Sequence, residues 1–290
     1  MADNEAVALT LTELNRFPVK SCRGEQLRTA VVEPWGLAGD RRWMLVDAEG
    51  ETVTAREHRQ LLLVTPRLRA DGGLEVAAPD KVPLSVARPV GDERVTVTIF
   101  RRTPFAATPS SDEAHEWFST LLGESVRLVY GDDPHRRPAS PDFAGAGVPL
   151  AFGDGYPVLL GHQASLAALN DQIAVGPRAA EGPLPMVRFR PNLVVAGGEA
   201  WAEDGWRRLR IGAAVFRAVK GCDRCALAAT DAETALRGKE PTATLARHRR
   251  WDGAVWFGMN VVPETPGAIL TVGDEVELLE TVPAPDGPPR

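Results

Sequence analysis

Cysteine is scarce in this chain, and long apolar runs are absent. Three cysteines in 290 residues cannot build a disulfide framework, and an odd number suits a reducing compartment. No run approaches the roughly 20 apolar residues of a membrane helix. The first residues, Met1 to Glu5, are acidic and are not followed by the apolar core of a signal peptide. We therefore expect a cytoplasmic protein without membrane association.

Positive charge is also in deficit. The chain has 33 basic and 39 acidic residues, a net charge of -6. Nucleic-acid-binding proteins usually carry a basic excess, so this balance argues against that class. Apolar residues make up 44% of the chain, and 290 residues are enough for two domains. The composition is therefore that of an ordinary globular protein, which we expect to be a monomer.

The N-terminal half reads as short strands followed by one helix. Asp71-Gly72-Gly73 lies between two apolar segments, which is a hairpin signature. Apolar residues recur at helical spacing from Asp112, and Gly123 is a natural stop. The predicted strands are 7–11, 42–46, 61–64, 68–70, 74–76 and 95–100.

The C-terminal half returns to strands after a segment rich in proline and glycine. Residues 131–150 are expected to be a linker or a mobile loop. A second helix is predicted over 163–171, and the tail after Val282 should fray. Further strands are predicted at 192–195, 208–211, 214–219 and 275–279. Many short strands and few helices indicate a β-rich α+β protein of barrel-like architecture, divided into domains at 7–130 and 131–282.

Two of the three cysteines, Cys222 and Cys225, lie three residues apart after a strand-like run. A zinc site needs about four ligands, but there is no second C-x-x-C and the five histidines are scattered. A thioredoxin-like dithiol would need a βαβ context, which this β-rich region does not offer. Two inert buried thiols fit the spacing better than either of these sites, because free cysteine is often buried. The spacing alone leaves all three readings open.

Four motifs occur in order along the chain. They are F-P-V-K-S at 17–21, G-D-R-x-W at 39–43, F-R-P-N at 189–192, and C-x-R-C with T-D and E-P-x-x-T-L between 222 and 245. On local pattern alone, Lys20 could be a surface lysine, and Asp40 with Arg41 a surface ion pair. Together the motifs resemble the MOSC domain family, close to the branch that contains the mitochondrial amidoxime-reducing component. The N-terminal half resembles the β-barrel domain that precedes the MOSC domain in that branch.

The resemblance implies a molybdenum-molybdopterin cofactor and assigns residues to it. Cys225 would be the thiolate ligand of the metal, which suits a metal already held by soft sulfur ligands. Arg224 beside it would favour the thiolate and bind the cofactor. The residues that would contact the pterin or its phosphate are Lys20, Ser21, Arg41, Arg190 and Asn192.

A further segment of the resemblance places Asp154 near the metal, where it could take part in proton transfer. On local pattern alone, Asp154 could be a turn residue. The family usually has a small hydroxyl residue after this aspartate, whereas Gly155 and Tyr156 stand here. Ala228 and Ala229 replace two threonines of the family pattern. Cys22 and Cys222 are expected to be structural.

Two functions remain open on the sequence. The resemblance implies reduction of amidoximes, hydroxylamines or N-hydroxylated bases. The alternative is a carrier that holds a persulfide on Cys225 or delivers bound cofactor. A ferredoxin-type cluster needs four cysteines, and no G-x-G-x-x-G fingerprint follows a strand. We therefore expect electrons from a separate ferredoxin, flavoprotein or haem protein.

Overall fold

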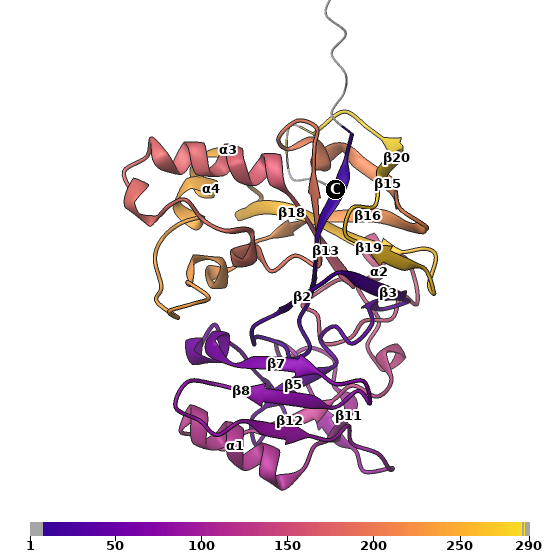
Figure 1. Ribbon diagram of the computed structural model, residues 1–290, viewed down its shortest axis with the longest axis vertical. Coiled ribbons are helices and arrows are strands. Elements are labelled where there is room, and N and C mark those ends of the chain that lie inside the picture. Colours follow the sequence, from indigo (N-terminus) through magenta and orange to yellow (C-terminus); the bar gives the residue numbers. More distant parts are fainter. Residues whose placement is uncertain (1–7, 286, 288–290) are drawn as a thin grey trace, which may run out of the picture.

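The computed structural model describes residues 8–285 and residue 287. The chain forms two lobes, with the N-terminal half largely in one and the C-terminal half in the other (Figure 1). The predicted start of the first strand and of the first domain, at residue 7, lies outside the described residues. The β-rich α+β class is confirmed, because strands form the body of both lobes.

One large sheet organises the C-terminal lobe. Only β13 and β14 pair in parallel; the other neighbours on its path are antiparallel. Its order is β2 (Glu25–Leu27), β1 (Thr10–Arg16), β14 (Leu193–Ala196), β13 (Val158–His162), β18 (Ala254–Pro263), β16 (Ala214–Asp223), β15 (Trp206–Ile211) and β20 (Val276–Thr281). β17 (Arg250–Trp251) pairs with β18, and a small sheet of β19 (Ile269–Thr271), β3 (Thr29–Glu33) and β4 (Gly36–Leu37) lies alongside.

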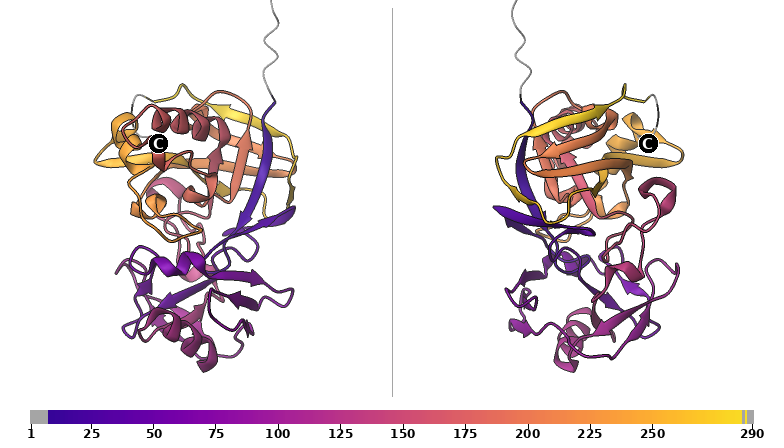
Figure 2. Two further views of the ribbon diagram at one scale, coloured as in Figure 1. Left: turned by 60° about the vertical axis from the view of Figure 1, so that its left-hand side comes forward. Right: turned by 90° about the vertical axis from the view of Figure 1, so that its right-hand side faces the viewer.

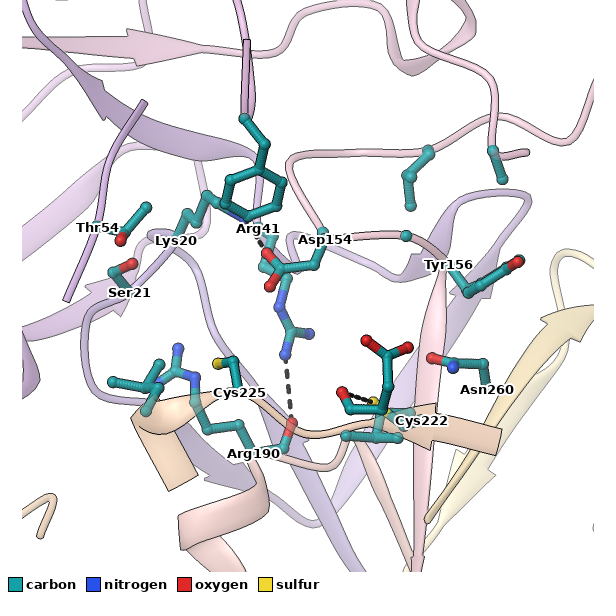
Figure 3. Close-up of a pocket in the computed structure, with 18 of the residues that line it drawn as sticks. Lys20, Ser21, Arg41, Thr54, Asp154, Tyr156, Arg190, Cys222, Cys225 and Asn260 are labelled. Carbon is teal, nitrogen blue, oxygen red and sulfur yellow. Dashed lines mark hydrogen bonds and ion pairs between the residues drawn. The ribbon is translucent and has the colours of Figure 1, made fainter. Parts of the chain in front are cut away.

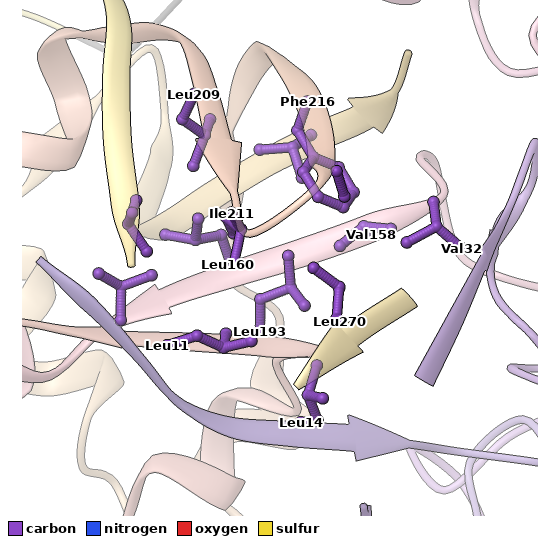
Figure 4. Close-up of a cluster of buried hydrophobic side chains, with 14 of the residues drawn as sticks. Leu11, Leu14, Val32, Val158, Leu160, Leu193, Leu209, Ile211, Phe216 and Leu270 are labelled. Carbon is purple, nitrogen blue, oxygen red and sulfur yellow. The ribbon is translucent and has the colours of Figure 1, made fainter. Parts of the chain in front are cut away.

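The core of this lobe takes side chains from both ends of the chain (Figure 4). Leu11 and Leu14 of β1 and Val32 of β3 pack with Leu193 and Phe216. In Figures 1 and 2 the indigo strand β1 runs along the upper lobe, among orange and yellow strands. Strand pairing therefore crosses the predicted division at residue 130, because the apolar faces of β1 and β3 are buried only against later strands.

The N-terminal lobe holds a second core. Its sheet is β10 (Val95–Val97), β11 (Phe105–Pro109), β12 (Arg127–Tyr130), β5 (Trp43–Val46) and β6 (Thr52–Val53). A meander of β7 (Thr65–Leu68), β8 (Leu74–Ala77) and β9 (Leu84–Val86) contains the predicted hairpin. Helix α1 (Asp112–Leu122) buries Trp117 and Phe118 against this core. Ser111 caps its start and Gly123, with φ 75°, ends it as predicted.

Two predicted strands are corrected by the structure. Residues 61–64 fall largely in a 3₁₀ helix, η1 (Arg59–Leu63), which buries Leu61 and Leu62 as one apolar face. The strand predicted over 95–100 ends at Val97, because Phe100 and Arg101 have positive φ angles of 56° and 52°. Alternation of apolar residues could not reveal this turn.

The helices of the C-terminal lobe are α2 (Pro141–Ala144), α3 (Gln163–Ala174) and α4 (Thr242–His248). Short 3₁₀ turns are η2 (Pro134–Arg136), η3 (Ala179–Glu181), η4 (Met186–Phe189), η5 (Ala202–Gly205) and η6 (Ala226–Ala229). α3 and α4 lie together on one side of the large sheet (Figure 1). The segment predicted as a linker, 131–150, contains η2 and α2. Among the described residues, no helix is both long and apolar enough to span a bilayer.

Candidate cofactor site

A cavity of about 1160 Å³ is lined by residues of both halves of the chain (Figure 3). Lys20, Ser21 and Arg41 reach it from the first 45 residues. Cys225 and Arg190 reach it from the C-terminal half. All eight residues predicted for the site line this one cavity, although they come from five separate segments of the sequence.

The loop that carries Lys20 and Ser21 is fixed by its backbone. The Lys20 amide donates to the Trp43 carbonyl at 2.8 Å, which ties the loop to β5. Gly24 closes the loop under the Phe17 ring, where a Cβ atom would lie 2.5 Å from the ring. Lys20 is 5% exposed, so it is not the surface lysine that its local pattern allowed.

Backbone strain gathers at this cavity. Nine described residues other than glycine have positive φ, and four of them line it. They are Ser21 (71°), Arg41 (47°), Phe100 (56°) and Arg190 (55°). Such conformations cost roughly 1 to 3 kcal/mol each and persist where surrounding structure enforces them. Three of the four are residues that the motifs had assigned to the cofactor.

Asp154 is held between two cations. The Lys20 ammonium and the Arg56 guanidinium both donate to its carboxylate, Arg56 at 2.9 Å. Burial alone would raise the pKa of Asp154, but Lys20 and Arg56 hold that pKa well below its usual range. Burial lowers the pKa of Lys20 to about 8, despite the opposing effect of Asp154. Asp154 is therefore an anion at neutral pH. Of the two groups, Lys20 is the one whose pKa lies nearer to neutral pH.

Arg41 is positioned by Asn192 and by the backbone of Arg190. It donates to the Asn192 side-chain oxygen at 3.0 Å and to the Arg190 carbonyl at 3.3 Å. Asn192 is 1% exposed and also binds the Leu159 amide, so it joins the site to β13. Arg41 pairs with Asp40 as well, but Asp40 is 2% exposed, so this is a buried pair.

Arg190 and Arg41 lie over one aromatic ring. Their guanidinium carbons are 4.3 Å and 4.6 Å from the centroid of Phe17. Burial and the neighbouring charge of Arg41 lower the pKa of Arg190 to about 10. No carboxylate of the described residues forms an ion pair with Arg190, although cation–π contact offsets part of its desolvation. Such a pair of cations favours an anionic ligand between or beside them.

The two thiols of C-x-x-C differ in their surroundings. Arg224 donates to the Cys222 sulfur at 2.9 Å and to the Phe189 carbonyl at 2.8 Å. Burial raises the pKa of Cys222 despite Arg224. Arg224 was predicted to favour the Cys225 thiolate, but its recorded sulfur contact is with Cys222. Both thiols line the cavity (Figure 3). The third cysteine, Cys22, does not line it, and burial raises the pKa of Cys22 to about 12.

Arg56 lies beside Cys225, and no motif of the sequence marks it. Burial would lower the pKa of Arg56, but Asp154 and Cys225 raise it above its ordinary value. Its guanidinium also lies 4.3 Å from the Phe100 ring centroid. Arg56 follows β6 in an ordinary T-A-R sequence with no periodicity or charge pattern to mark it. Only the fold brings it to the thiol.

Protein ligands alone do not form a metal site here. Across the described residues, no three His, Cys, Asp or Glu side chains gather closely enough to hold an ion. A closed zinc site therefore finds no support. Cys225 precedes the single 3₁₀ turn η6 rather than an α-helix, which differs from a thioredoxin-like dithiol.

The cavity does fit an anionic cofactor that brings its own metal ligands. Lys20, Arg41 and Arg190 supply positive charge, and Cys225 supplies one soft donor. The buried Nε atoms of Arg188 and Arg224, which also line the cavity, have no hydrogen-bond partner within the described structure. Unpartnered buried donors are expected where a ligand completes the site.

Comparison with known proteins agrees with these motifs. Residues 8–125 match the MOSC N-terminal beta barrel domain, and residues 148–277 match the MOSC domain. Mitochondrial amidoxime-reducing component 1 of Homo sapiens is 32% identical over 291 residues, 93% of this chain and 83% of that protein. Mitochondrial amidoxime reducing component 2 of Bos taurus is 31% identical, over 92% and 82%.

A second group of relatives is much longer. Molybdenum cofactor sulfurase of Oryza sativa subsp. japonica is 31% identical over 259 residues. That match covers 84% of this chain but only 31% of the relative, so the chain spans about a third of its length.

Proposed function

Because the chain belongs to the MOSC domain family, with a MOSC N-terminal domain before the MOSC domain, we propose that it is a molybdenum-cofactor-dependent reductase of N-hydroxylated compounds. One observation carries this proposal. Cys225, Asp154, Lys20, Arg41 and Arg190 converge on one cavity from separate segments of the chain. Relatives of similar length are named amidoxime-reducing components, which suggests the substrate class.

The chain's own residues would bind and orient the cofactor. Cys225 would give the metal its protein thiolate, and the Arg56 guanidinium would lie beside it. Lys20, Arg41 and Arg190 would hold the anionic pterin and its phosphate, supported by Ser21, Asn192 and Arg224. When bound, the cofactor would supply the two electrons and the oxygen-accepting chemistry of the reduction.

Asp154 and Lys20 would have different roles beside the reacting group of the substrate. An amidoxime takes two electrons and two protons and gives an amidine and water. Asp154, ionised beside Lys20 and Arg56, would accept a hydrogen bond from the substrate N–H or O–H. Lys20 would stay charged beside the anionic cofactor and keep Asp154 ionised.

The test measures metal content and turnover together. Protein purified under mild conditions should carry close to one molybdenum per chain and reduce benzamidoxime anaerobically with a reduced artificial dye. Stoichiometric molybdenum without reduction of any N-hydroxylated substrate would reject the reductase and leave a binding role.

Electrons would come from a separate protein. Three cysteines are too few for a ferredoxin-type cluster, and two of them line the proposed molybdenum site. Purified protein should therefore not reduce benzamidoxime with NADH or NADPH alone, and should do so when a ferredoxin, flavoprotein or haem protein is added. Steady turnover with NADPH alone would contradict this.

The alternative function is sulfur or cofactor transfer, which the match to molybdenum cofactor sulfurase favours. In that case Cys225 would carry a persulfide donated by a partner protein. Intact-protein mass spectrometry separates the two: a mass increase of one sulfur atom at Cys225, with little bound molybdenum, supports the carrier.

A further inference from the structure

One surface turn of the C-terminal lobe reaches across to the N-terminal lobe. This bridging turn, residues 231–237, lies between η6 and α4 and is the orange segment that descends toward the lower lobe in Figure 1. Arg23 donates to the Ala232 carbonyl at 2.8 Å and pairs with Glu233 at 3.1 Å. These two contacts join the bridging turn to the loop that carries Lys20 and Ser21.

Arg23 is fixed on the N-terminal side of this contact. Its backbone amide donates to the Val64 carbonyl at 2.9 Å, and the neighbouring Cys22 is buried in the core of the N-terminal lobe. The Arg23 side chain is 29% exposed, so its ion pair is partly shielded from solvent. The bridging turn is therefore the partner that can move.

Hydrogen bonds within the bridging turn make it stiff. The Asp231 carboxylate accepts from the amides of Glu233 and Thr234 at 3.0 Å and 2.9 Å. The Asp231 amide donates to the Leu236 carbonyl at 2.8 Å. A turn that is bonded to itself in this way moves as one unit.

The bridging turn is attached to its own lobe without apolar packing. Within the described part of the chain, none of residues 231–237 belongs to a buried apolar cluster, and Leu236 is 69% exposed. Arg188 pairs with Asp231 at 3.1 Å. Segments with few buried apolar contacts open at a low cost in free energy, so polar contacts such as that with Arg23 decide how often this turn opens.

Both sides of the contact lie beside the cofactor cavity without forming its wall. Ser21, two residues before Arg23, lines the cavity, and so does Arg237 at the end of the bridging turn. Arg23, Ala232 and Glu233 do not line it. The contact between the lobes can therefore be removed without removing a group that would touch the cofactor.

The groups that would hold the cofactor lie deep between the lobes. Lys20 and Ser21 are 5% and 7% exposed, although both line a cavity of about 1160 Å³. A cofactor that reaches them has to pass the rim of the cavity. The bridging turn crosses from one lobe to the other at that rim.

We propose that the bridging turn is a latch that gates the exchange of the ligand in this cavity. While Arg23 holds Ala232 and Glu233, the two lobes stay joined and the ligand is retained. When this contact opens, the edge of the cavity between Ser21 and Arg237 opens, and the ligand enters or leaves. The proposal applies to any anion that the cavity holds, so only its molybdenum measurements rest on the proposed function.

A latch differs from a binding residue in its kinetics. Entry and exit both pass through the open state, so more frequent opening raises both rates by the same factor and leaves the affinity unchanged. Loss of a residue that contacts the ligand raises the exit rate and weakens binding. Arg23→Ala should raise both rates about tenfold, which corresponds to about 1.4 kcal/mol in the opening equilibrium. The loss of one hydrogen bond and one partly exposed ion pair is of this size.

The first experiment follows molybdenum in both directions. Exit is the molybdenum lost from loaded protein after dilution, and entry is the molybdenum regained by cofactor-free protein from cofactor released by a donor molybdoenzyme. Arg23→Ala should speed both, with an affinity within about twofold of the wild type. Arg28→Ala is the matched control and should keep both rates, because Arg28 is exposed, lies on the same segment and does not line the cavity.

A second variant guards against a folding defect in Arg23→Ala. Glu233→Gln is an isosteric change of a side chain that is 73% exposed, so it removes the ion pair and leaves the packing intact. It should speed entry and exit by an equal but smaller factor, because the hydrogen bond to the Ala232 carbonyl remains.

The second experiment needs no cofactor. Fluorescein maleimide is a planar anion of a size comparable to that of the pterin cofactor, and it has to enter the cavity to label Cys225 in cofactor-free protein. Arg23→Ala should speed this labelling about tenfold, and Arg28→Ala should not change it. Trypsin cleaves after Arg224, so peptide mass spectrometry separates Cys225 from Cys222.

Three results would overturn the latch. They are unchanged exchange rates in Arg23→Ala, faster exit with unchanged entry, and unchanged labelling of Cys225. The second result would make Arg23 a residue that binds the ligand. If the purified protein carries no molybdenum, the proposed function fails, and the labelling of Cys225 still decides the latch.

Discussion

Two clusters of charged side chains in this molecule have opposite character. The open cluster, Lys20, Arg41, Arg56, Asp154 and Arg190, borders the cavity. The closed cluster, His162, Ser165, Glu203, Asp204 and Arg249, lies in the C-terminal lobe, and none of its members lines that cavity. In the open cluster, four cations surround one carboxylate, Asp154, and Arg41 also pairs with Asp40. In the closed cluster, the two acidic and the two basic side chains are equal in number.

The closed cluster ties three elements to the large sheet. Glu203 of η5 accepts from Ser165 of α3 at 2.8 Å and lies 3.0 Å from His162 at the end of β13. Arg249, after α4, donates to both oxygens of Asp204 at 2.9 Å and 2.7 Å. Its guanidinium lies 4.1 Å from the Trp201 ring centroid. Asp204 faces Arg249 and Glu203 faces His162, so each carboxylate has a partner within the protein, although the Oε1 atom of Glu203 has none among the described residues.

This comparison distinguishes charged residues that stabilise the fold from charged residues that bind a ligand. A buried charge with its partner in place fixes the packing around it, and removing one partner leaves the other stranded. A buried charge without enough partners costs stability in the free protein and gains it back when a ligand binds. The closed cluster should therefore govern folding, and the open cluster should govern what the cavity holds.

The largest effect is expected at the thiol beside the open cluster. Cys225→Ala should lose its molybdenum almost completely, because the protein ligand disappears from a cavity that otherwise still forms. Circular dichroism and the melting temperature should match those of the wild type, with metal measured by mass spectrometry. Cys222→Ala is the control and should keep most of its metal. The reverse pattern would mean that Cys222 is the ligand.

The next largest effect is expected in the closed cluster. Asp204→Ala strands Arg249 and should lower the free energy of unfolding by about 3 to 5 kcal/mol, measured by urea titration. Molybdenum per folded chain should not change. The double variant Asp204→Leu with Arg249→Met should be more stable than the single one, because no charge is left unpaired. A single variant as stable as the wild type would contradict this role.

Removing a cation of the open cluster should reduce cofactor binding without reducing stability, which is the opposite of the result expected for the closed cluster. Lys20→Ala and Arg190→Ala should each weaken cofactor retention by about one to two decades, because each deletes a charge-assisted contact. Cofactor-free protein should be as stable as the wild type or more so, since burial disfavours both charges in the absence of a ligand. Molybdenum remaining after serial dilution gives the first quantity and thermal melting the second. A large loss of stability would place these residues among the structural ones.

The smallest effect is a pH dependence of retention. The pKa of Lys20 is lowered from 10.5 to about 8, so this ammonium loses its charge as the pH rises through 8 in the cofactor-free protein. A bound anion favours the charged form and raises that pKa, so release should speed up modestly between pH 8 and 10. Lys20→Arg keeps its charge across that range and should flatten the profile. Equal slopes in both proteins would exclude Lys20 as the titrating group.

Local patterns in the sequence predicted much of the fold and the site. Where the predictions were wrong or incomplete, there is a physical reason. Helix α1 was predictable because its apolar stripe, Ser111 cap and Gly123 stop are all local. Residues 61–64 were misread because a short apolar run is buried equally well in a strand or a 3₁₀ turn. Arg56 could not be found, because its role depends on contact with residues about 100 and 170 positions away.

The sequence by itself determined the β-rich class, most strand and helix positions, and the motifs that carry Lys20, Arg41, Arg190 and Cys225, because these depend on residue types and short spacings. The tertiary structure decided the rest. It placed β1 in the sheet of the C-terminal lobe and assigned Arg224 to Cys222 and Arg56 to Cys225. Partners of a buried charge are chosen by which distant segments the cores bring together, and a linear pattern does not contain that information.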